Sequence, residues 1–201
     1  MKKNKDEIEL LRKWYKEHPD STTVECSEGT GIAVKDIYHN RKEIPDFRLP
    51  VAKNVTILGQ EMNSGLMFKD LNESFISDNR LSVRKYGLQV NDKYISFAEP
   101  IEVEGGLFEE RNSYIYFADN MIDNIHLTAK VNGNKNIKWR RREIHLNWLE
   151  SVFGKPNTGN PFSEYDFENV VIRNEWTLEY DYFIAIYFKQ KRGRFIVKKE
   201  D

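Results

Sequence analysis

Residues 140–153 constrain the fold of this chain more than any other segment. At about 100° per residue, their apolar side chains cover a helical arc of about 200°. Gly154 stands where helices commonly end, and Pro156 prevents the helix from continuing. A helix with so wide an apolar face needs a broad surface to pack on. The segment therefore predicts a deeply buried helix, and the arc consists of Ile144, His145, Leu146, Trp148, Leu149, Val152 and Phe153.

Strand signals lie on both sides of this helix. The run from Tyr182 to Phe188 is apolar on both pleat faces, which is typical of a central strand covered on each side. Asn132-Gly133 predicts a tight hairpin, with residues 137–139 as the short returning strand. The other expected strands are residues 32–37, 55–58, 81–90, 94–97, 114–117, 122–131, 170–179, 180–188 and 194–198.

The order of these segments defines the fold class. Strands and helices do not alternate regularly, as a parallel sheet with crossover helices would require. We therefore predict an α+β fold with mostly antiparallel sheet, packed by one long helix in the C-terminal half. A short amphipathic helix precedes it at the N-terminus.

The N-terminal helix is expected at residues 5–17. Ile8, Leu11 and Tyr15 share one helical face, and Pro19 ends the helix. Such a short helix is not stable alone, so we expect residues 1–19 to dock on the body of the protein rather than on a partner. Residues 20–201 then form a single α+β domain, with a possible subdivision near residues 105–121. Secondary-structure patterns in residues 20–71 are weak, and we expect residues 40–54 to form an irregular connection.

Composition excludes several classes of protein. The chain has 201 residues, 39% hydrophobic and 31% charged, which is typical of a soluble globular protein. Its 31 basic and 32 acidic residues nearly cancel, so binding of nucleic acid or anionic membrane must be local. No signal peptide and no membrane-length apolar run is visible, which predicts a cytoplasmic protein. Cys26 is the only cysteine, so an internal disulfide is excluded.

Motifs for chemistry are missing from the sequence. The four histidines, His18, His39, His126 and His145, lack the spacing that brings two imidazoles to one metal. Gly29-Thr30-Gly31 lacks the rest of a phosphate-binding loop and reads as a turn. We therefore predict no metal, no cofactor and no catalytic residues. We expect His145 to be a core histidine hydrogen-bonded to a backbone carbonyl.

Charges segregate along the chain. Cations gather around Trp139 and Phe195, in residues 135–142 and 189–199, which suits nucleic acid. Acids gather in residues 99–110 and 164–181 among aromatic residues, which suits a basic protein partner. The candidate partner-binding residues are Glu102, Glu104, Glu109, Glu110, Glu179, Tyr180 and Asp181.

One segment carries a resemblance to known proteins. Residues 146–156, Leu-Asn-Trp-Leu-Glu-Ser-Val-Phe-Gly-Lys-Pro, precede strands that carry Trp176 and a final hairpin. This pattern, over residues 122–201, resembles small bacterial helix-on-sheet proteins, including β-lactamase-inhibitory-protein-like domains and toxin-immunity proteins. The resemblance implies a fold and carries no site.

The leading hypothesis is a non-catalytic protein that binds another protein, such as an immunity factor or inhibitor. A nucleic-acid-binding accessory protein that uses the two basic segments is the first alternative. An enzyme without a recognisable motif is the second. The sequence gives no oligomeric state.

Overall fold

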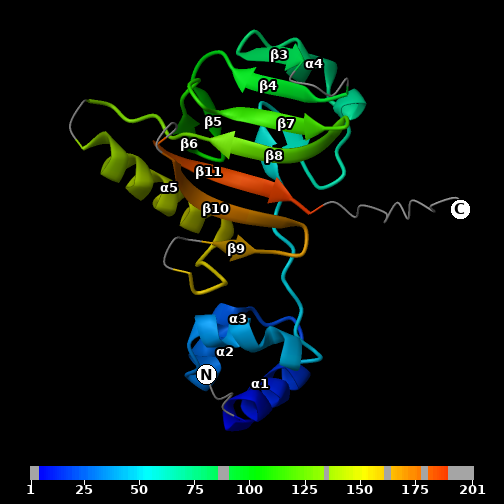
Figure 1. The fold of residues 1–201 in the computed structure, drawn as a ribbon, viewed down its shortest axis with the longest axis vertical. Coiled ribbons are helices and arrows are strands. Elements are labelled where there is room, and N and C mark those ends of the chain that lie inside the picture. The colour runs from blue at the N-terminus through cyan, green and yellow to red at the C-terminus, as the bar shows by residue number, and fades with distance from the viewer. Residues whose placement is uncertain (1–4, 86–90, 134–135, 161–163, 178–180, 190–201) are drawn as a thin grey trace, which may run out of the picture.

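The chain folds into a small helical unit and a larger body of two sheets (Figure 1). The computed structural model describes residues 5–85, 91–133, 136–160, 164–177 and 181–189. Within them the fold is α+β with antiparallel strand pairings, which confirms the predicted class. None of the helices in this part of the chain has the length and apolarity to span a membrane.

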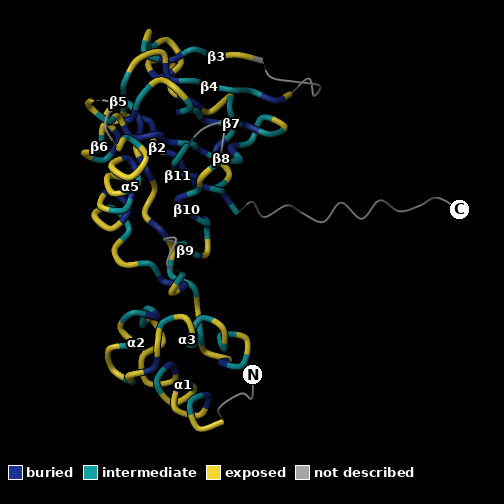
Figure 2. Tube along the Cα trace, turned by 60° about the vertical axis from the view of Figure 1, so that its left-hand side comes forward, coloured by how far each residue is buried: buried dark blue, intermediate teal, exposed yellow. Residues whose placement is uncertain are grey.

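The helical unit contains α1 (Lys5–Glu17), α2 (Thr23–Thr30), α3 (Val34–Asn40) and the 3-10 turn η1 (Arg41–Glu43). It has a buried cluster of its own, separate from that of the sheets: Leu11, Tyr15, Cys26, Ile32, Ile37 and Ile44. Figure 2 shows buried residues in both parts of the molecule. The helix of residues 5–17 therefore packs on α2 and its neighbours.

The strand expected at residues 32–37 is wrong, because this segment contains most of the first turn of α3. The β-branched residues Ile32, Val34 and Ile37 favour a strand locally. Ile37 of α3 and Ile44, which directly follows η1, are however both buried in the helical cluster. Burial in this cluster outweighs the local strand preference.

The body contains two sheets. The smaller has the order β2-β1-β5-β6, and the larger has the order β3-β4-β7-β8-β11-β10-β9. Strand β11 lies between β8 and β10, as predicted for an apolar central strand. The strands are β1 (Val55–Ile57), β2 (Gln60–Met62), β3 (Leu81–Lys85), β4 (Lys93–Phe97), β5 (Ile101–Val103), β6 (Gly106–Phe108), β7 (Tyr114–Ala118), β8 (Met121–Leu127), β9 (Tyr165–Asp166), β10 (Val170–Thr177) and β11 (Asp181–Phe188). Two short elements, η2 (Phe68–Asp70) and α4 (Glu73–Ile76), connect β2 to β3.

Helix α5 (Ile137–Phe153) packs on β11 and β10 and ends at Gly154, as predicted. Gly154 has φ +76°, a conformation that glycine adopts readily. The buried face of α5 is narrower than the predicted apolar arc, because Ile144, a member of that arc, is 36% exposed. Trp148 and Leu149 are buried in the core that the two sheets share.

The returning strand expected at residues 137–139 is wrong, because these residues form the first turn of α5. Asn136, directly before this helix, has φ +55°. The signals at residues 55–58, 94–97 and 114–117 correspond to β1, β4 and β7. The expected strand at residues 194–198 and residues 86–90 of another lie outside the described part of the chain.

Trp148 lies between α5 and the smaller sheet. Its Nε1 donates to the Val103 carbonyl at 2.9 Å, and its ring meets Phe108 edge-on with centroids 5.2 Å apart.

We expect Trp148→Ala to lower the free energy of unfolding by about 3–5 kcal/mol, because it opens a cavity and leaves the Val103 carbonyl without its hydrogen-bond donor. Denaturant titration measures this change. The matched control is Trp139→Ala on the same helix, where the side chain is 67% exposed and the expected change is about 0.5 kcal/mol or less. Equal stability of the two variants would contradict the assigned packing.

Candidate nucleic-acid interface

Helices α2 and α3 are joined by a tight turn that depends on glycine. Gly31 has φ +73°, and its N–H donates to the Ser27 carbonyl at 2.9 Å, which ends α2. Only residues 31–33 separate the two helices. Two short helices joined by a three-residue turn with glycine form a helix-turn-helix arrangement.

The start of α2 is held by a capping box. The Glu25 N–H donates to Thr22 Oγ1 at 3.2 Å, and the Thr22 N–H donates to the Glu25 carboxylate at 2.8 Å. The bond from the Thr22 backbone lowers the pKa of Glu25. This reciprocal cap fixes where α2 begins, and so it fixes the position of the turn.

The two helices keep their angle because they share a core with α1. Cys26 of α2, Ile32 of the turn and Ile37 of α3 are buried together with Leu11 and Tyr15 of α1. Burial is also the main cause that raises the pKa of Cys26, so the thiol stays protonated. Cys26 is therefore a core residue of this unit.

The side of α3 that faces away from this core is basic. Lys35 and His39 on α3 and Lys42 in η1 are exposed. The Arg41 guanidinium lies 3.9 Å above the centre of the Tyr38 ring and donates to the Tyr38 carbonyl at 2.8 Å. In helix-turn-helix proteins the second helix enters the major groove of DNA and its N-terminal residues contact base edges. Lys35 and Tyr38 occupy the corresponding part of α3.

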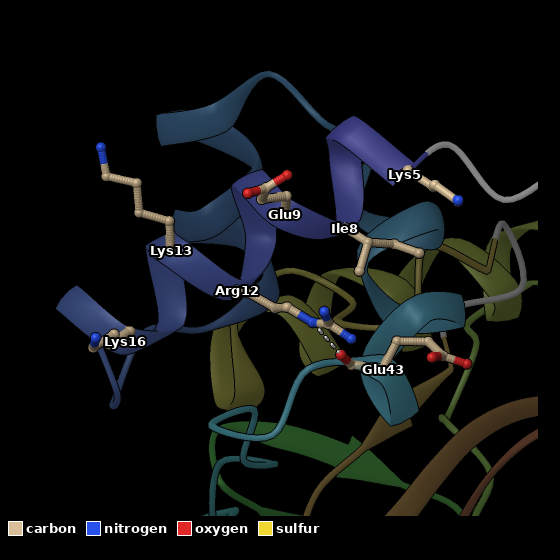
Figure 3. Close-up of a pocket in the computed structure, with 7 residues that line it drawn as sticks. All are labelled: Lys5, Ile8, Glu9, Arg12, Lys13, Lys16 and Glu43. Carbon is tan, nitrogen blue, oxygen red and sulfur yellow. Dashed lines mark hydrogen bonds between the residues drawn. The ribbon is translucent and has the colours of Figure 1, made fainter.

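A second basic surface runs along α1 (Figure 3). An open groove of about 820 Å³ is lined there by Lys5, Ile8, Glu9, Arg12, Lys13, Lys16 and Glu43. Arg12 crosses it and donates from Nε to the Glu43 carbonyl at 2.8 Å. Cations outnumber carboxylates four to two in this lining, so it can attract phosphate groups.

The predicted acidic surface is partly neutralised within the chain. Arg141, from one of the predicted basic segments, lies 3.0 Å from a Glu109 oxygen and 3.0 Å from an Asp181 oxygen. Its Nε donates to the Ala129 carbonyl at 3.1 Å. Burial raises the pKa of Glu109, and the charge of Arg141 lowers it. Glu109 and Asp181, one from each predicted acidic segment, thus both contact the buried Arg141.

The other predicted partner-binding residues are dispersed. Glu104, at the turn between β5 and β6, accepts from the Thr56 N–H at 3.0 Å and from Lys53 at 3.4 Å. Glu102 and Glu110 are exposed. Glu179 and Tyr180 lie outside the described residues.

The predicted basic segments do not form one strip in the described residues. Arg140 donates to the Asn132 carbonyl at 2.7 Å, and Lys138 lies 5.6 Å from the centre of the Trp176 ring. Lys189 pairs with Asp166. Residues 134–135 and 190–199 are outside the described part of the chain.

His145 is a core histidine, as predicted, with different partners from those expected. Its Nε2 accepts from the Ala129 N–H at 2.8 Å, and its Nδ1 lies 3.1 Å from Asn174 Oδ1. This network assigns the ring proton to Nδ1. Burial lowers the pKa of His145 to about 3. The neutral ring is therefore part of the packing between α5 and the sheet.

The comparisons with known proteins give no relatives. No family model, no curated protein and no solved structure matches the chain. The resemblance to inhibitory and immunity proteins therefore stays a prediction.

The helix-turn-helix arrangement did not emerge from the sequence pattern. Three local signals indicate it once they are read together: the Thr22-x-x-Glu25 cap, Gly31 eight residues after Thr23, and the apolar residues at 26, 32 and 37. Each alone is common, and only their spacing identifies the motif.

We expect Arg141→Met to lower the free energy of unfolding by about 3–5 kcal/mol, because it leaves Glu109 and Asp181 as uncompensated, partly buried charges. Adding Glu109→Gln should recover part of the loss. Arg140→Met is the neighbouring control with an exposed side chain, and denaturant titration is the measurement. A loss as small as that of the control would show that the ion pairs contribute little.

We expect stability to fall as the pH drops below about 6.5, because the unfolded state then protonates His145 whereas the native state does not. His126, whose pKa burial lowers to about 4, acts in the same direction. Each histidine contributes a slope approaching about 1.4 kcal/mol per pH unit. Unfolding titrations between pH 6.5 and 5 should therefore show a shallower slope for His145→Gln than for the wild type; equal slopes would refute the assignment.

Proposed function

We propose that the N-terminal helical unit binds double-stranded DNA, with α3 as the helix that enters the major groove. The observation that carries this proposal is the α2–turn–α3 arrangement, with Gly31 in the left-handed conformation and a shared core with α1. Residues 34–43 then present Lys35, Tyr38, His39 and Lys42 to the nucleic acid.

Residues 34–43 carry a small net positive charge. Three cations and two carboxylates lie in residues 34–43: Lys35, Arg41, Lys42, Asp36 and Glu43. This segment alone therefore makes few phosphate contacts. The groove along α1 offers additional cations for phosphates.

A basic protein partner at the acidic surface has less support, although it stays a prediction. Glu109 and Asp181 already bind Arg141, and a partner would have to compete with that contact. For this reason the nucleic-acid alternative becomes the leading one, at a site different from the basic segments first considered.

The test is a charge reversal on α3. We expect Lys35→Glu combined with Lys42→Glu to weaken binding to a fluorescein-labelled duplex of mixed sequence by about tenfold or more. The slope of log affinity against log salt should become shallower by about two, since about two phosphate contacts are lost. Fluorescence anisotropy at several salt concentrations measures both quantities.

The matched control reverses two exposed lysines of the body, Lys69→Glu and Lys130→Glu, and so makes the same change in net charge. It should retain most of the affinity. Equal losses in the two double variants would mean that only overall charge matters and would exclude α3 as the binding element.

A further inference from the structure

The body of the protein covers part of α3. Views in Figures 1 and 2 agree that α3 lies on the side of the helical unit nearer to β9. The Tyr38 hydroxyl donates to Asp166 Oδ2 at 2.5 Å, and the Thr23 hydroxyl donates to the Asn157 carbonyl at 2.8 Å. Gly159 lies so close to α3 that a Cβ added to it would be 2.5 Å from the backbone nitrogen of Lys35.

The contacts at Lys35 and Tyr38 involve the part of α3 that would meet DNA, whereas the Thr23 contact is made by the start of α2. Lys35 is in the first turn of α3 and Tyr38 follows one turn later. A duplex that receives the N-terminal half of α3 in its major groove needs this space. Residues 157–160 and 164–166 therefore cannot contact this part of the helix at the same time as a DNA duplex.

The covering residues 157–160 and 164–166 include two acids, Glu164 and Asp166, and hydrogen bonds hold Asn157 and Asp166 together. The Asp166 carboxylate binds both Tyr38 and Lys189. The Asp166 N–H donates to Asn157 Oδ1 at 2.8 Å, and Asn157 Nδ2 donates to the Asp166 carbonyl at 2.8 Å. Burial raises the pKa of Tyr38 to about 12, with the bond to Asp166 as the next cause. The neutral phenol is thus the donor, as a contact to a carboxylate requires.

A short connection separates the two anchored parts of the chain. Phe47 packs edge-on against Tyr15 with ring centroids 5.1 Å apart, which ties it to the helical unit. The Pro50 carbonyl accepts from the Glu168 N–H at 2.8 Å, which ties it to the body. Arg48 and Leu49 lie between these anchors, so a rotation about their backbone can separate the two parts.

We propose that the described conformation is autoinhibited: residues 157–160 and 164–166 occupy the DNA-binding side of α3, and DNA binds only after the helical unit rotates away about Arg48 and Leu49. This inference rests on the proposed function. The apparent affinity for DNA is then reduced in proportion to the fraction of open molecules.

The test introduces a larger side chain at the contact between α3 and the body, in the full chain. Gly159→Asn adds a side chain against Lys35, and because asparagine tolerates a positive φ, the main effect is steric. Gly105→Asn is the matched control, since Gly105 also has a positive φ and a Cβ added to it would meet no atom within 4 Å. Asp166→Asn, which removes the acceptor charge at Tyr38, is the second variant.

Two measurements are made on each protein. Small-angle X-ray scattering reports opening as an increased radius of gyration, and anisotropy of the labelled mixed-sequence duplex reports affinity. We expect Gly159→Asn and Asp166→Asn to increase the radius and to bind the duplex about tenfold more tightly than the wild type. The Gly105→Asn control should match the wild type in both.

The outcomes separate the two proposals. An open variant that binds DNA no more tightly than the wild type overturns autoinhibition and leaves the proposed function intact. An open variant and a wild type that both fail to bind at low salt overturn the proposed function and, with it, this inference. Unchanged radii in both folded variants show that the contact does not hold the two parts together, which also overturns autoinhibition.

Discussion

The backbone of Ala129, which follows β8, binds two side chains of α5. Arg141 donates to its carbonyl and His145 accepts from its N–H, so two side chains one helical turn apart hold both backbone polar groups. Ala129 also bridges to Phe108 at the end of β6. This fully buried residue is therefore the point where α5 and both sheets meet. Without these two bonds its polar groups would be unsatisfied in the core.

Polar groups at this junction are costly to bury, and the structure satisfies most of them. Arg141 has a side chain only 10% exposed and gains two carboxylates and one carbonyl as acceptors. Asp181 Oδ1, in contrast, is buried without a hydrogen-bond partner, and Asp181 has φ +64°. We expect a buried charged cluster of this kind to contribute more to the orientation of α5 on the sheet than to stability.

Local signals predicted those elements whose ends are marked by the chain itself. Gly154 and Pro156 gave the end of α5, and the apolar run of β11 gave its central place in the sheet. The start of α5 and the whole of α3 were missed, because short β-branched or apolar segments favour strands until their tertiary neighbours are known. Helix α2 was missed as well: it buries only Thr23 and Cys26, and its last residues, Gly29-Thr30, read as a turn although only Gly31 lies beyond the helix. Arg141 lies 32 positions after Glu109 and 40 positions before Asp181 in the sequence. No periodicity within one element can indicate such a pairing.

The two separate buried clusters have a consequence for how the molecule opens. The cluster of the helical unit contains six residues, far fewer than that of the body, so the helical unit forms the weaker cooperative unit. Native-state fluctuations should unfold it while the sheets stay intact. Cys26, the single cysteine of the chain, is fully buried in this smaller cluster. The rate at which a thiol reagent modifies the unaltered protein therefore reports on partial unfolding of the helical unit, separately from global unfolding.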